Sequence, residues 1–110
     1  MSIANRTSIS ERPADADGKR FGDFEMDTVV GKGNHGTIVT LIERSTNMLF
    51  MRKLTKGKNA KELARTVIHL LSPFKGHIKS ITADNGTEFA CHERISKSLG
   101  VNIYFADPYS

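Results

Sequence analysis

The chain has 110 residues, 38% hydrophobic and 25% charged, which is the size and mixture of one soluble globular domain. No run approaches the roughly 18 consecutive apolar residues of a membrane span, and residues 1–10 lack the apolar region of a secretory signal, so we expect a cytosolic protein with no membrane partner. A lone cysteine excludes an internal disulfide, and the net charge of +4 suits a polyanionic partner without requiring one.

The first twenty residues, Met1–Arg20, contain almost no large apolar side chain and are predicted to form a linker or flexible arm. Such a composition buries too little surface to offset the entropy of ordering. From Phe21 onward, three short β-prone runs follow, FEMDTVV, TIVTLIE and MLFMRKL, and they predict a three-stranded antiparallel meander. The glycine-rich loop Gly31–Gly36 is followed by Thr37 and Ile38 where a phosphate-binding P-loop needs Lys and then Ser or Thr, so a hairpin connection is predicted.

A helical period replaces the β pattern after the third run. Asn59 and Glu62 form a capping-box-like start, and apolar residues recur at helical spacing until Pro73. These features predict an amphipathic helix with one buried face.

The remaining segments alternate between strand and helix. Ile78–Ala83 is predicted to be a short strand, Thr87–Leu99 a second helix ended by Gly100, and the alternating apolar residues after it a fifth strand. The order β-β-β-α-β-α-β predicts an α/β fold with a mixed five-stranded sheet, in which three antiparallel strands are extended by two parallel ones. Residues 21–110 are therefore predicted to form the folded core.

Two acidic residues occupy positions that call for an explanation. Asp27 lies in an otherwise apolar strand, where a carboxylate is costly unless it meets a cation or a donor. Asp84 follows the strand Ile78–Ala83, and ligands commonly bind at the carboxyl ends of strands in open α/β sheets. If these strands are neighbours, the two carboxylates converge and suit Mg²⁺ or Mn²⁺. The alternative, which spacing alone favours, is an Asx-turn of Asp84 with Asn85 and Gly86, and a salt bridge at Asp27.

Three segments carry a resemblance to a known family. GDFEMDTVVGKG, TLIERSTNMLFMRKL and ITADNGTEFACHERISKSLGVNIYFADPYS resemble the catalytic core of bacterial insertion-sequence transposases. The likeness is closest to the group named after insertion sequence thirty, which is related to retroviral integrases. It runs from Phe21 to Ser110, and ISERP in the arm resembles the linker that precedes such cores.

The resemblance implies a ribonuclease H-like fold in which Asp, Asp and Glu hold two Mg²⁺ ions, with Mn²⁺ as a substitute. The first Asp carries over onto Asp27 and the second onto Asp84. The family's third residue is a Glu in an Asn-Glu-Asn stretch after the Asp-Pro-Tyr segment, and this sequence reaches only Ser110, so the third catalytic Glu is absent from it. Asp107 does not match that Glu. The helices that follow the fifth strand in the family are missing as well.

Other candidate side chains have simpler explanations. Glu88 matches the family's Asp-Asn-Gly-x-Glu-Phe turn, but an acid in the first turn of a helix is favourable through the helix dipole alone. Glu25 shares strand alternation with Asp27, and exposure at a sheet edge accounts for it. Cys91 is expected to be a small buried side chain, and the four histidines show no zinc-ligand spacing.

Basic residues are dense between Arg52 and Arg65, and Lys53, Lys56 and Lys58 are the candidate contacts to DNA phosphates. A solvated polar face is the alternative. The resemblance implies DNA transposition by a polynucleotidyl transferase, with metal-dependent cleavage and strand transfer at DNA phosphodiesters and no small-molecule cofactor. Expected partners are DNA, as insertion-sequence ends and target, and further copies of the chain in a homo-oligomer. The expected location is the bacterial cytoplasm, at the nucleoid.

Because the third acidic residue is absent, we expect these 110 residues to be inactive on their own. A different class of function, a non-catalytic DNA-binding or self-association module, stays open at this point.

Overall fold

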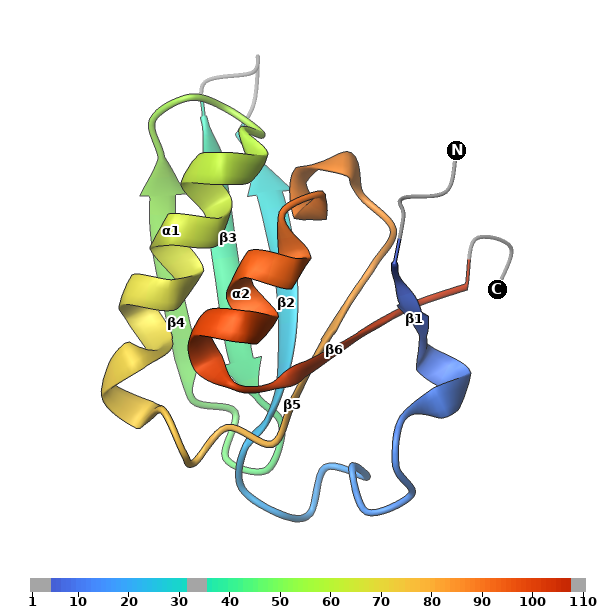
Figure 1. Ribbon diagram of the computed structural model, residues 1–110. Coiled ribbons are helices and arrows are strands. Elements are labelled where there is room, and N and C mark those ends of the chain that lie inside the picture. Colours follow the sequence, from blue (N-terminus) through green and yellow to red (C-terminus); the bar gives the residue numbers. More distant parts are fainter. Residues whose placement is uncertain (1–4, 32–35, 108–110) are drawn as a thin grey trace.

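The computed structural model describes residues 5–31 and 36–107, and its centre is a six-stranded sheet in the order β1-β6-β5-β2-β3-β4 (Figure 1). Two α-helices and three short 3₁₀ helices complete the described part. The strands are β1 (Thr7–Ser8), β2 (Asp23–Val30), β3 (Thr37–Glu43), β4 (Leu49–Leu54), β5 (Ser80–Ala83) and β6 (Asn102–Phe105). The helices are η1 (Ile9–Glu11), α1 (Ala60–Leu71), η3 (Ser72–Phe74), η4 (Thr87–Phe89) and α2 (His92–Leu99).

The pairing of the strands confirms the predicted mixed α/β fold. β2, β3 and β4 pair antiparallel in chain order, and a backbone hydrogen bond of 2.8 Å from Gly31 N to Gly36 O closes the β2–β3 hairpin. β5 pairs parallel with β2, and β6 pairs parallel with β5, so α1 and α2 lie on the crossovers. The rest of the Gly31–Gly36 loop lies outside the described residues.

The prediction of five strands is one strand short, because β1 adds a sixth from within the predicted arm. Thr7 pairs with Tyr104 and Ser8 with Phe105, in parallel. A two-residue strand that joins a sheet edge does so through its backbone, which leaves almost no side-chain pattern to detect. The division of the chain into an arm at residues 1–20 and a core at 21–110 stays a prediction.

Local signals set the ends of the helices. At the start of α1, Asn59 Oδ1 accepts a 2.9 Å hydrogen bond from Glu62 N, as the capping pattern predicts. The predicted helix Thr87–Leu99 is divided: η4 is a 3₁₀ turn, and regular helix begins only after Cys91, whose ψ of 28° is not helical. Gly100 ends α2 in the left-handed conformation, with φ 66°.

Both α-helices cover the same face of the sheet (Figure 1). Side chains that alternate along β2 and β3 pack beneath them, including the fully buried Phe24, Val39 and Leu41, and α1 contributes Leu63 and Val67. The opposite face of β2, β3 and β4 has no helix of the described chain over it. No helix of the described residues is both long and apolar enough to span a membrane.

Candidate active site

The structure brings the two predicted acidic residues together at the carboxyl ends of neighbouring strands. The parallel register of β2 and β5 ends with Met26 opposite Ala83, and Asp27 and Asp84 are the next residue on each side. Both residues are exposed, on the sheet face that the helices leave open, and both line a surface hollow of about 300 Å³. The two strands are therefore neighbours, which is the condition set by the sequence for the two carboxylates to converge.

Each carboxylate has one oxygen fixed by a backbone amide nearby. Asp27 Oδ1 accepts from Thr28 N at 2.8 Å, and Asp84 Oδ1 accepts from Gly86 N at 2.8 Å. The second bond is the Asx-turn that the structural alternative predicts for Asp84. The matching alternative for Asp27 is wrong within the described part of the chain, where no salt bridge includes it. A turn that engages one oxygen of Asp84 still leaves a carboxylate able to bind a cation.

The donor set fits a hard divalent cation, although it is small. Two carboxylates beside an open surface hollow match Mg²⁺ or Mn²⁺, which prefer oxygen ligands and keep several waters. Within residues 5–31 and 36–107, no group of three or more His, Cys, Asp or Glu side chains is arranged to hold a metal. Asp27 and Asp84 would thus supply two ligands to the metal and not a complete set of protein ligands.

Glu88 has a larger role than the helix-dipole explanation gives it. Its side chain is buried, its Oε2 accepts a 2.6 Å hydrogen bond from Thr28 Oγ1, and Lys58 Nζ lies 3.9 Å from the same oxygen. A Cβ at Gly86 would lie 2.2 Å from Glu88 Oε1, so the turn after Asp84 packs directly on this carboxylate. Glu88 therefore ties η4 to β2 one residue beyond Asp27. The Asp-Asn-Gly-x-Glu-Phe motif was the sequence signal for it.

Arg6 is a residue of this region that the sequence analysis missed. Its guanidinium donates to Asn85 Oδ1 at 3.2 Å and to Gly86 O at 2.8 Å, and lies 4.3 Å from the centre of the Phe105 ring. Burial lowers the pKa of Arg6, while the negative charges of Asp84 and Glu88 act in the opposite direction. No pattern in a polar arm marks one arginine out from another, so only the fold reveals this contact.

The three predicted DNA-contacting lysines lie around the end of the sheet that carries the acidic residues. Lys53 is exposed on β4 opposite Ile38, which in turn faces Val29, so Lys53 shares the open sheet face with Asp27. Lys56 and Lys58 are exposed in the loop between β4 and α1.

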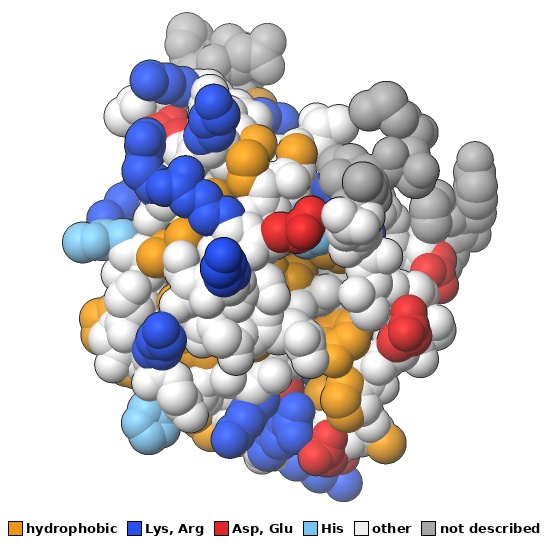
Figure 2. Space-filling model, in the orientation of Figure 1, with side chains coloured by type: hydrophobic (Ala, Val, Ile, Leu, Met, Phe, Trp, Pro, Cys, Tyr) orange, Lys and Arg blue, Asp and Glu red, His pale blue; other side chains and the backbone are white. Residues whose placement is uncertain are grey.

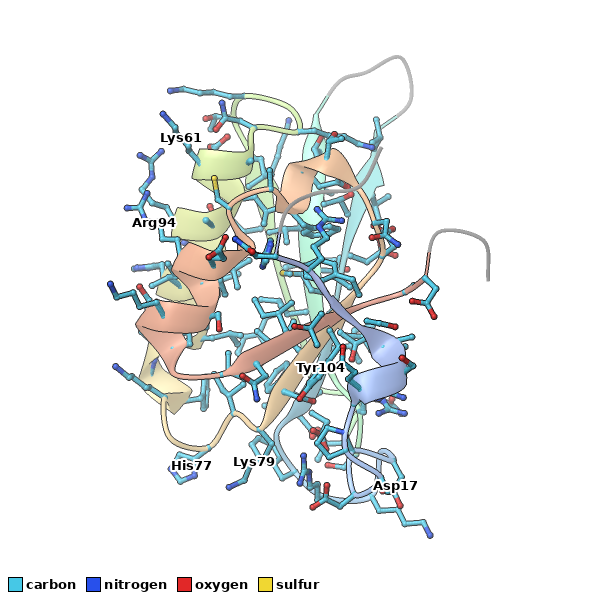
Figure 3. All side chains as sticks on the ribbon, turned by 45° about the vertical axis from the view of Figure 1, so that its right-hand side comes forward. Asp17, Lys61, His77, Lys79, Arg94 and Tyr104 are labelled. Carbon is cyan, nitrogen blue, oxygen red and sulfur yellow. The ribbon has the colours of Figure 1, made fainter. Side chains whose placement is uncertain are left out.

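Further basic side chains continue from these lysines onto the helical side. Figure 2 shows Lys and Arg side chains gathered over α1 and the loop before it. In Figure 3, Lys61 lies at this end of the molecule, whereas His77 and Lys79 lie at the opposite end. One group of basic side chains therefore lies at the same end of the sheet as the acidic pair, and a second group, which includes Lys79, lies at the opposite end (Figures 2 and 3).

The remaining candidates have structural explanations. Glu25 is exposed as predicted, 4.0 Å from Arg44 Nε, but β2 lies inside the sheet and not at an edge. His92 is buried with its ring 4.9 Å from that of Phe105, and Cys91 is half-buried. His35 lies outside the described residues.

Comparisons with known proteins identify relatives of the chain and solved structures that share its fold. No protein-family model matches the chain. The chain is 44% identical over 108 residues to the transposase for insertion sequence element IS4351 of Bacteroides fragilis, a match that covers 97% of this chain and 33% of that protein. It is 34% identical over 113 residues to the transposase InsI for insertion sequence element IS30C of Escherichia coli K12, covering 100% of this chain and 29% of that protein.

The solved structures show the same fold. The catalytic core domain of BIV integrase superposes with a TM-score of 0.64 at 21% identity, covering 80% of this chain and 56% of that one. The chain spans about a third of the length of the curated relatives it matches. It is a homologue of the insertion-sequence transposases, including those of IS30 elements, and has the fold of a retroviral integrase catalytic core.

Proposed function

We propose that this chain forms part of the catalytic core of a DNA transposase, a polynucleotidyl transferase that cleaves and joins phosphodiesters with the help of divalent metal. The single observation that carries the proposal is that Asp27 and Asp84 directly follow the last register pair of β2 and β5 and line one hollow. Homology to transposases supports the reaction class, and the donor chemistry supports the metal.

In the proposed reaction, Asp27 and Asp84 hold the metal, and the protein's other groups bind and orient DNA. Bound Mg²⁺ or Mn²⁺ supplies charge stabilisation for the attacking and leaving oxygens of an in-line displacement. Lys53 lies on the same sheet face as Asp27, and Lys56 and Lys58 are exposed in the loop after β4. We propose that these three lysines neutralise DNA phosphates. Such contacts position the backbone of the DNA without reading its sequence.

The 110 residues supply two of the three acidic ligands that the resemblance implies. We therefore expect them to bind divalent metal weakly, with two ions held only when a third carboxylate completes the site. Cleavage and strand transfer are accordingly proposed for a protein of the length of the relatives, and not for these residues alone.

A second candidate function, self-association, rests on a different observation. The open sheet face exposes large apolar side chains on three adjacent strands: Val29 is 54% exposed, Ile42 38%, Leu49 50% and Met51 53%. Contiguous apolar surface of this kind marks interaction sites. This face also carries Asp27 and Lys53, so as the alternative to DNA binding there we propose that copies of the chain associate through it. A strictly monomeric mass by light scattering at high concentration would contradict it.

The test of the metal site is a titration of the chain with Mn²⁺, followed by paramagnetic broadening of backbone amide signals. We expect broadening centred on the amides of Asp27 and Asp84, and its loss in Asp27→Asn and Asp84→Asn because an amide does not replace a carboxylate as a ligand. Glu25→Gln is the matched control, since Glu25 lines the same hollow but pairs with Arg44.

Two results would count against the proposal. Broadening that stays unchanged in both Asn variants would place the metal elsewhere. In a protein of the relatives' length, normal strand transfer by Asp27→Asn or Asp84→Asn would remove that residue from catalysis.

A further inference from the structure

The arm that precedes the core is built into the candidate site. β1 lies along the outer edge of β6, Asn5 Nδ2 donates to Glu93 Oε1 of α2 at 3.1 Å, and Ser8 Oγ donates to Asp107 Oδ1 at 2.6 Å. These contacts hold residues 5–8 across the end of β6, beside the turn that follows β5. The arm thus holds Arg6 beside the turn that follows Asp84.

Arg6 makes a two-pronged contact with the turn that carries Asp84. Nη1 donates to the side chain of Asn85 and Nη2 to the carbonyl of Gly86, at 3.2 and 2.8 Å. Gly86 is also the residue whose amide holds Asp84 Oδ1. Arg6 therefore binds both residues that follow Asp84, and one of these residues, Gly86, directly orients the Asp84 carboxylate.

The turn is held from two further sides. The Asn85 side-chain amide also donates to Ala106 O, beyond the end of β6. Buried Glu88 packs against Gly86. Both terminal nitrogens of Arg6 donate to the turn and its Nε is buried, so the contacts of this arginine in the structure are with the protein.

We propose that Arg6 is a positioning residue that fixes the Asp84–Gly86 turn and so sets the Asp84 carboxylate in place for metal binding. The proposal rests on the proposed function for the metal, but its geometric part, the clamping of the turn, is independent of it. Groups that orient a ligand from behind commonly change metal affinity by about 10- to 100-fold when removed. The predicted arm would on this account belong to the site that it precedes.

The experiment compares the chain with Arg6→Gln, Arg6→Lys and Ser8→Ala. Ser8→Ala is the control for general loosening of the arm, because Ser8 contacts Asp107 and not the turn. The first measurement is hydrogen exchange of the Gly86 amide in metal-free protein. We expect exchange to rise about tenfold in Arg6→Gln, since a hydrogen bond to a charged group is lost at each of two positions, and to change little in Ser8→Ala.

The second measurement is the Mn²⁺ concentration at half-maximal broadening of the Asp84 amide, expected to rise about tenfold in Arg6→Gln. Arg6→Lys keeps the positive charge but loses the forked guanidinium, so it separates the effect of the charge from the effect of the two hydrogen bonds. A Gly86 exchange rate in Arg6→Gln equal to that of the wild type, or to that of Ser8→Ala, would overturn the clamp. Restoration of both readouts by Arg6→Lys would overturn the two-pronged geometry. Absence of Mn²⁺ broadening in the wild type would instead refute the metal site, while the exchange result would still test Arg6.

Discussion

Glu43 offers a test of how the sheet is held together, because it is a fully buried carboxylate. One oxygen, Oε1, accepts from Ser45 Oγ at 2.7 Å and from the amide and hydroxyl of Thr46 at 2.8 and 2.9 Å, and Oε2 accepts from Gly22 N at 2.8 Å. The side chain thereby joins the β3–β4 turn to the start of β2. Replacing it with glutamine keeps the shape but removes the charge and sets an NH₂ group against a donor.

The size of the effect follows from the pKa. Burial by itself would raise the pKa of Glu43, but the donors from Ser45, Gly22 and Thr46 outweigh it and lower the pKa from 4.5 to about 2. The difference corresponds to about 3 kcal/mol of folding free energy above pH 4.5, where the carboxylate is charged in both states. As the pH falls from 4.5 toward 2, the unfolded chain takes up the proton first, and this stabilisation is lost.

The assay is urea denaturation of wild type and Glu43→Gln at pH 7 and at pH 3. At pH 7 we expect Glu43→Gln to lower the free energy of unfolding by about 3 kcal/mol, and at pH 3 the difference should shrink by about 2 kcal/mol. The difference in free energy of unfolding between the two proteins is used because the pH dependence contributed by the other carboxylates is the same in both and cancels. Glu25→Gln, which changes an exposed acid on the paired strand, should shift neither value by more than about 0.5 kcal/mol. A Glu43→Gln cost that is the same at both pH values would refute the reasoning.

Two further changes test local structure, both by thermal or urea unfolding. Gly22→Ala should lower the free energy of unfolding by more than about 2 kcal/mol, because φ is +114° and the new Cβ would lie 2.4 Å from His77 O. Gly57→Ala is the control, since Gly57 also has positive φ but nothing lies within 4 Å of its new Cβ, and it should cost only about 1 kcal/mol. Equal costs for the two variants would contradict the steric argument. Asn59→Ala should cost about 1 kcal/mol and Asn59→Ser much less, because serine can still accept from Glu62 N at the start of α1; an equal cost for both would exclude the cap as the cause.

Some features of the fold are local and could be predicted residue by residue. Asn59 before an apolar 3.6-residue period specifies the start of α1, and Gly100, which adopts positive φ at no steric cost, specifies the end of α2. The antiparallel meander follows from three β-prone runs joined by short loops. These signals act over a few residues, so they hold whatever the rest of the chain does.

Other features depend on contacts between distant segments. β1 forms only because the edge of β6 is open to it, and Glu62 turns from the capping box to accept from Thr55 and Lys56 instead. Glu43 owes its depressed pKa to donors that converge from two loops. A carboxylate in such a place is indistinguishable, in the sequence, from one exposed on a strand.

The candidate site also has some features that the sequence predicts and others that depend on contacts between distant segments. The sequence by itself determined five of the six strands, the two α-helices and their order, and the position of Asp27 within one strand and Asp84 after another, because strand and turn propensities are set by neighbouring residues. Only the tertiary structure decided that β5 lies against β2 in a register that makes the two aspartates neighbours, and that Arg6 reaches the Asp84 turn from 79 residues before Asn85. A periodic pattern shows which face of a strand is buried, but it does not show which distant strand or arm lies beside that strand, because that depends on which surfaces bury one another in the whole fold.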